Sequence, residues 1–110
     1  MSQGGSSPAQ VLLNKRYQAQ VESSLASAAI AQESYIAQPR DSYTDDVAQL
    51  LERGFQARPA VSIDVLSAGT SSYCIQATHR NLPTDHPFKV ASYDSEVGRP
   101  VAEDDCHVYD

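Results

Sequence analysis

The feature that most constrains the fold is an uninterrupted segment, Ala9 to Gln38, that contains neither glycine nor proline. Apolar and small residues recur along it in steps of three and four, which is the spacing of one helix face. The members of this stripe are Leu13, Tyr17, Val21, Leu25, Ala28, Gln32, Tyr35 and Ile36. The opposite side carries Lys15, Gln18, Glu22, Ser23, Ser27 and Glu33. A helix of about 28 residues is about 42 Å long. We expect its N-terminal part to project or to pack on another body.

The stretch "QESYIAQPRDSYTDD" follows this stripe and predicts a corner in the chain. Pro39 should end the helix, because proline lacks the amide donor and disfavours helix at the residue before it. Thr44 is predicted to cap a second, short helix with acidic residues in its first turn. That helix should run to about Arg53, with Gly54 just beyond its end. The two tyrosines of this stretch are expected to pack beside the break and to carry no chemistry.

Beyond Pro59 the hydrophobic period changes from that of a helix to that of a strand. In "VSIDVLS" (61–67) apolar and polar residues mostly alternate, and "YCIQATH" (73–79) and "FKVASYD" (88–94) read as two further strands between turns. The tail from Ser95 is predicted to be irregular. Helices followed by strands indicate an α+β fold: a long N-terminal helix packed on a small antiparallel sheet of three or four strands, with a short second helix in the connection.

The bulk composition excludes several function classes. The net charge of −6 over 110 residues argues against a groove for nucleic acid, because an acidic surface repels phosphates. The Lys and Arg residues are scattered and form no run that would hold an anionic membrane. No apolar stretch approaches the roughly 18 residues of a membrane-spanning helix.

Cys74 and Cys106 are the two cysteines of the chain. The pair could form a disulfide, remain as two thiols, or contribute to a metal site. Neither has a second cysteine within the spacing of zinc ligands, and the three histidines show no helical pairing, so the disulfide is the favoured interpretation. A disulfide would indicate an oxidising compartment.

Several segments together resemble the type IV pilin and pseudopilin family, in particular the small bacterial pilins of the Thermus and Deinococcus kind. "AQVLLNKRYQAQVESSLASAAIAQESY" is similar to the exposed C-terminal half of the long first helix of these subunits. "DSYTDDVAQLLERGF" resembles the Ser-Tyr-Thr segment and the short helix after it. "VSIDVLSAGTSSYCIQATH" resembles their first two strands, and "FKVASYDS" with Cys106 resembles the third strand and the cysteine that closes the disulfide-bounded loop.

The resemblance implies a non-enzymatic, structural role. Such a subunit assembles with copies of itself into a pilus filament for adhesion, motility or DNA uptake, served by a pilus assembly machinery. It lies in the inner membrane before assembly and at the extracellular cell surface afterwards. The family's processing site and apolar helix half are expected before residue 9, and the membrane is contacted only through them. Residues 1–8 are expected to be a flexible leader, and residues 9–110 a single pilin-like domain.

Two alternatives to a pilin remain open. One is a pseudopilin of a type II secretion or competence machine, and the other is a small secreted binding domain stabilised by its disulfide. An enzyme is not expected. Cys74, His79 and Asp94 could be imagined as a catalytic group, but an odd spacing on a strand places Cys74 and His79 on opposite faces. His79 is expected at the surface.

Two further sets of residues were weighed as sites, and no catalytic, cofactor or metal residue is predicted from them. The first is a set of acidic oxygen donors that could hold Ca²⁺, although their spacing does not match a calcium-binding loop: Asp94, Glu96, Glu103, Asp104 and Asp105. The second is an aromatic set, Tyr35, Tyr43 and Tyr73. We expect these tyrosines to pack in the core with their hydroxyls reaching the surface.

Overall fold

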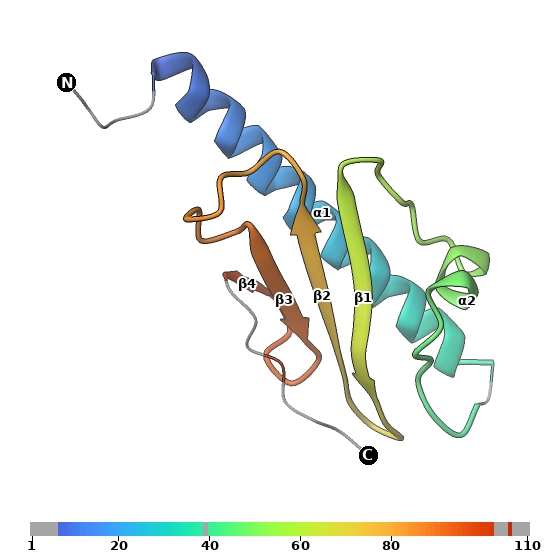
Figure 1. Ribbon diagram of the computed structural model, residues 1–110. Coiled ribbons are helices and arrows are strands. Elements are labelled where there is room, and N and C mark those ends of the chain that lie inside the picture. The colour runs from blue at the N-terminus through green and yellow to red at the C-terminus, as the bar shows by residue number, and fades with distance from the viewer. Residues whose placement is uncertain (1–6, 39, 103–105, 107–110) are drawn as a thin grey trace.

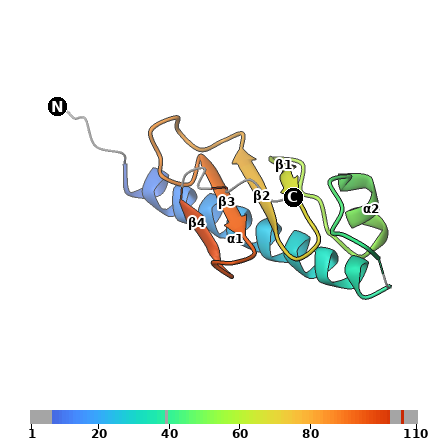
Figure 2. The ribbon, with the colours of Figure 1, turned by 90° about the horizontal axis from the view of Figure 1, so that it is seen from below.

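The computed structural model describes residues 7–38, 40–102 and 106, and its architecture is the predicted α+β arrangement (Figure 1). Two helices precede a four-stranded antiparallel sheet whose strands follow one another in chain order. The elements are α1 (Pro8–Ile36), α2 (Val47–Glu52), β1 (Val61–Ala68), β2 (Tyr73–His79), β3 (Val90–Asp94) and β4 (Pro100–Ala102). The long helix lies along one side of the sheet, as the view from below shows (Figure 2).

Local chemistry explains where α1 begins and ends. The Ser7 side chain accepts a hydrogen bond from the amide of Gln10, and Pro8 occupies the first helical turn, where its missing amide is not needed. The helix therefore already includes Pro8, which the sequence analysis assigns to the leader. It ends at Ile36, capped by Ala37. Pro39, the predicted helix breaker, lies outside the described residues.

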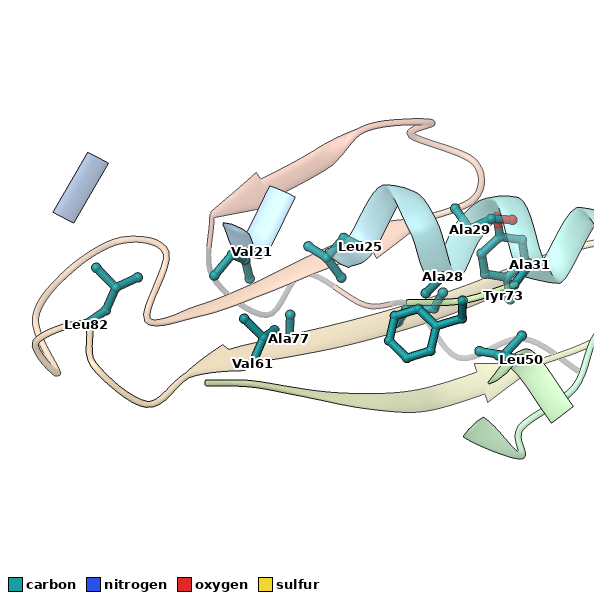
Figure 3. Close-up of a cluster of buried hydrophobic side chains, with 13 residues drawn as sticks. Val21, Leu25, Ala28, Ala29, Ala31, Leu50, Val61, Tyr73, Ala77 and Leu82 are labelled. Atoms are coloured by element: carbon teal, nitrogen blue, oxygen red, sulfur yellow. The ribbon is translucent and has the colours of Figure 1, made fainter. Parts of the chain in front are cut away.

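The predicted stripe of α1 forms the helix side of the core over the middle of the helix. Val21, Leu25 and Ala28 are fully buried and pack against Ile75 and Ala77 of β2 in one cluster (Figure 3). Alanines on this face let the sheet approach the helix closely. The stripe fails at its N-terminal end, because Leu13 lies beyond the sheet and keeps 37% of its surface exposed.

The sheet differs from the prediction at its last strand. The third strand begins at Val90 rather than at Phe88, and the tail that was expected to be irregular contains β4, paired with β3. Gly98 allows the turn between them, because its φ of 79° is a conformation that residues with a Cβ rarely adopt. A three-residue strand is too short for a sequence period to reveal.

The short helix α2 has a different cap from the predicted one. Asp46, rather than Thr44, is the N-cap residue, and its carboxylate accepts a hydrogen bond from the amide of Ala48. Thr44 lies two residues before the cap, and its backbone is held by α1: the Gln32 side chain donates to the Thr44 carbonyl (2.7 Å) and accepts from the Thr44 amide (3.0 Å). Both residues are buried. Gly54 follows the helix with a φ of 98°, as predicted for the position after a helix end.

Candidate functional site

The structure separates the three residues that a catalytic cysteine group would need. Cys74 is bonded to Cys106 and pairs in register with Asp94 across β2 and β3. His79 belongs to the other face of β2, where its ring lies 4.7 Å from that of Tyr17 in α1. A cysteine in a disulfide is no nucleophile. The arrangement therefore brings Cys74 and Asp94 together without the histidine.

His79 is fully buried, so the expectation of a surface histidine is wrong. Its Nδ1 accepts from the amide of Asn81 (3.0 Å), which leaves the proton on Nε2, 2.8 Å from the Gln20 side-chain oxygen. Burial, followed by the charges of Lys89 and Arg80, lowers the pKa of His79. A neutral, doubly hydrogen-bonded imidazole connects α1 to the end of the sheet. This histidine has a structural role.

The structure contains the disulfide that the sequence analysis favours, between Cys74 and Cys106, with Cα atoms 5.4 Å apart. Cys74 is fully buried on β2. The bond therefore fixes the chain beyond β4 to the second strand of the sheet.

The proposed calcium donors do not converge in the described part of the chain. The Asp94 carboxylate accepts from the amide of Glu96, and the Glu96 carboxylate accepts from the hydroxyl of Ser72 (3.0 Å). The other three acidic candidates, residues 103–105, lie outside the described residues. Among the residues that are described, no group of three or more His, Cys, Asp or Glu side chains could hold a metal ion.

Tyr43, Tyr73 and Tyr93 form a cluster, of which Tyr93 is not in the aromatic set named from the sequence. The ring of Tyr73 lies 4.7 Å from that of Tyr43 and 6.2 Å from that of Tyr93, which stacks nearly parallel to it. Tyr35 is elsewhere, with its ring under the guanidinium of Arg40. The Tyr73 hydroxyl was expected to reach the surface, and this expectation is wrong. Tyr73 is buried, and its hydroxyl donates to the carbonyl of Ala29. Burial raises its pKa well above the ordinary value.

The N-terminal part of α1 extends past the end of the sheet (Figure 1), and apolar side chains remain exposed there. Val11 keeps 43% of its surface exposed, Leu12 65% and Leu13 37%. We call these three consecutive residues the apolar tip of α1. Lys15 and Arg16 follow after Asn14 and are exposed.

A groove of about 430 Å³ lies between the C-terminal half of α1 and the connection from β3 to β4. We call it the α1–β4 groove. Its residues are Ala26, Ala29, Ile30, Glu33, Tyr73, Tyr93, Ser95, Gly98, Arg99 and Pro100. Ile30 lies at its rim with 70% of its surface exposed, the largest exposed fraction among the exposed large apolar side chains of the described residues. Its lining combines small and aromatic side chains with one carboxylate and one guanidinium.

The carboxylate in this groove is held in place. Glu33 accepts a hydrogen bond from the hydroxyl of Tyr43 at 3.2 Å. Burial, and then the adjacent Glu33 charge, raises the pKa of Tyr43. The Glu33 carboxylate therefore lies on the α1 side of the groove, with the Tyr43 hydroxyl as its hydrogen-bond donor.

The α1–β4 groove could not be predicted from the sequence. Tyr93 and Arg99 come from segments that were assigned to a strand and to an irregular tail, and only their pairing brings them beside α1. One signal was visible in the sequence: Ile30 is an apolar residue off the predicted core stripe.

A scan against models of known protein families finds no match for this chain, and a comparison with curated proteins finds none either. No helix in the described residues is long and apolar enough to cross a membrane.

Proposed function

We propose that the chain is a structural subunit that assembles with copies of itself into a filament of the type IV pilus kind. The observation that carries the proposal is α1: a helix of 29 residues packs its middle and C-terminal parts on an antiparallel sheet and extends past that sheet with apolar side chains exposed. The projecting part of α1 adds nothing to the core of its own domain. A helix shared between a domain and its neighbours explains both parts.

Other features support the same proposal. The residues weighed for catalysis have structural roles, since Cys74 is in a disulfide and His79 is buried between α1 and the sheet. A disulfide is typical of proteins outside the reducing cytosol, which agrees with the proposed location on the cell surface, after passage through the inner membrane. The order of a long helix, a short helix and an antiparallel sheet is also the order that the resemblance to pilins implies.

Immunoelectron microscopy of the producing cells tests the proposal. An antibody raised against this chain should label filaments along their whole length, and deletion of the gene should remove both the label and the filaments. Restoration of the gene serves as the control. Labelling confined to the cell envelope, with loss of secretion or of DNA uptake on deletion, would favour a pseudopilin. A chain secreted without any filament would refute the proposal and favour a small secreted binding domain.

A further inference from the structure

We infer that the apolar tip of α1 of one copy docks in the α1–β4 groove of a second copy, with the two helices parallel and displaced by 18 residues. This inference rests on the proposed function, because it supplies a contact through which copies would assemble. It also concerns surfaces that the isolated chain already carries, so it is tested separately from filament formation.

The tip and the groove cannot meet within one chain. Ile30 follows Leu12 on the same straight helix by 18 residues, which is five turns, or about 27 Å along the axis. Both side chains therefore point to the same side of α1. That side lies away from the core face of Val21, Leu25 and Ala28. Only another molecule can place a tip against the groove.

At a displacement of 18 residues, the exposed α1 residues of the groove face residues of the tip region that match them in polarity or charge. Leu12 falls over Ile30, which joins the two most exposed of the large apolar side chains in the described chain. Lys15 falls beside Glu33, which joins an exposed ammonium group to the carboxylate that Tyr43 holds. The same displacement sets Pro8 and Val11 over the small residues Ala26 and Ala29 of the groove.

The antiparallel alternative matches less well. A two-fold pair that places Leu12 over Ile30 brings Lys15 beside residue 27, six residues or about 9 Å short of Glu33. The parallel arrangement satisfies the apolar contact and the charge pair together. It is also heterologous, so each copy retains a free groove for the next one and the contact does not close. Arg99 lies on the opposite wall of the groove from α1, away from Lys15.

The test begins with the isolated chain at millimolar concentration, observed by NMR and by sedimentation. Unlabelled chain added to ¹⁵N-labelled chain should shift the amide signals of the apolar tip and of the groove, and sedimentation should show species larger than a dimer as concentration rises. Absence of these shifts overturns the inference. Growth that stops at a dimer overturns the parallel arrangement.

Two matched variants separate the tip from the groove. Leu12→Gln and Ile30→Gln each replace an exposed apolar side chain by a good helix former, so both should fold. Each variant alone should lose its self-association. A mixture should recover it, because labelled Leu12→Gln still has a groove and Ile30→Gln still has a tip. The amide signals of the groove of labelled Leu12→Gln should then shift. A mixture that shows no shift contradicts docking of the tip in the groove.

A charge exchange tests the displacement itself. Lys15→Glu and Glu33→Lys should each weaken association by up to about fivefold, as one exposed pair allows, and the double variant should recover it. The control exchanges Lys15 with Glu22, a residue of α1 outside the groove, and should not recover it. Failure of these experiments beside labelled cell-surface filaments would refute this contact and leave the proposed function standing. Their success without any filament would refute the proposed function alone.

Discussion

Replacement of Gln32 by leucine tests the claim that one buried amide holds the corner of the chain. Gln32 is fully buried in α1, and its side chain makes both hydrogen bonds of the Thr44 backbone, to the amide and to the carbonyl. Leucine has a similar size and fits the helix, so the substitution removes the two hydrogen bonds without leaving a large cavity. Thr44 is itself 4% exposed, so water does not replace them readily.

The expected loss follows from these contacts. A buried donor or acceptor left without a partner costs about 1–3 kcal/mol, and Thr44 would have one of each. The additional apolar surface of leucine returns about 1 kcal/mol. We therefore expect the free energy of unfolding to fall by about 1–5 kcal/mol, a large part of the roughly 5–15 kcal/mol of a small domain.

Equilibrium unfolding in urea, followed by far-UV circular dichroism, measures this change. Gln18→Leu in the same helix is the matched control, because Gln18 is only partly buried; it should change the stability by less than about 0.5 kcal/mol. If Gln32→Leu were as stable as this control, the hydrogen bonds to Thr44 would not hold the corner. The loop before α2 would then owe its position to packing alone.

Three further predictions concern the disulfide, the buried histidine and the cap of α2. Replacement of Cys74 and Cys106 by alanine should lower the free energy of unfolding by about 3–4 kcal/mol, the loop entropy released over their separation of 32 residues; an unchanged urea midpoint in the variant would contradict this. The folded-state pKa of His79 is lowered below 6.5, so the unfolded chain binds its proton more tightly. The contribution of a neutral His79 to stability should therefore be complete above pH 6.5 and should be lost as the pH falls below it. Urea midpoints measured from about pH 8 to about pH 5.5 should fall less steeply in His79→Gln than in the control His86→Gln. Equal slopes would refute this assignment. Asp46→Ala should cost about 0.5–2 kcal/mol by loss of the cap, which thermal unfolding would register; no change would mean that α2 does not depend on it.

Much of the fold follows from local patterns that the sequence displays openly. Two kinds of element were predictable because each repeats its own hydrophobic period several times. They are the long helix, with its core stripe at Val21, Leu25 and Ala28, and the first two strands. Gly54 was predictable because few other residues tolerate its backbone angle. The strand β4 was not, because three residues carry no period.

The site was far less predictable than the fold. Ile30 could be noticed as an apolar residue on a polar face. The residues that form the other wall of the groove, however, lie more than 40 residues later in the chain. Polar residues misled the prediction most. His79 looks like a surface residue until Gln20 of α1 supplies its partner, and Thr44 looks like a helix cap until Gln32 binds its backbone.

The sequence by itself determined the kind of chain this is: a long helix, a short helix and an antiparallel sheet, since periods and turn residues act over a few neighbours. Only the tertiary structure decided what lies beside what. It buried His79, stacked Tyr93 on Tyr73, and left Leu12 and Ile30 exposed on one side of α1. The physical reason is that a sheet buries only the face of a helix that it covers, and only along its own length. This sheet is shorter than α1, and the uncovered part is where another molecule can bind.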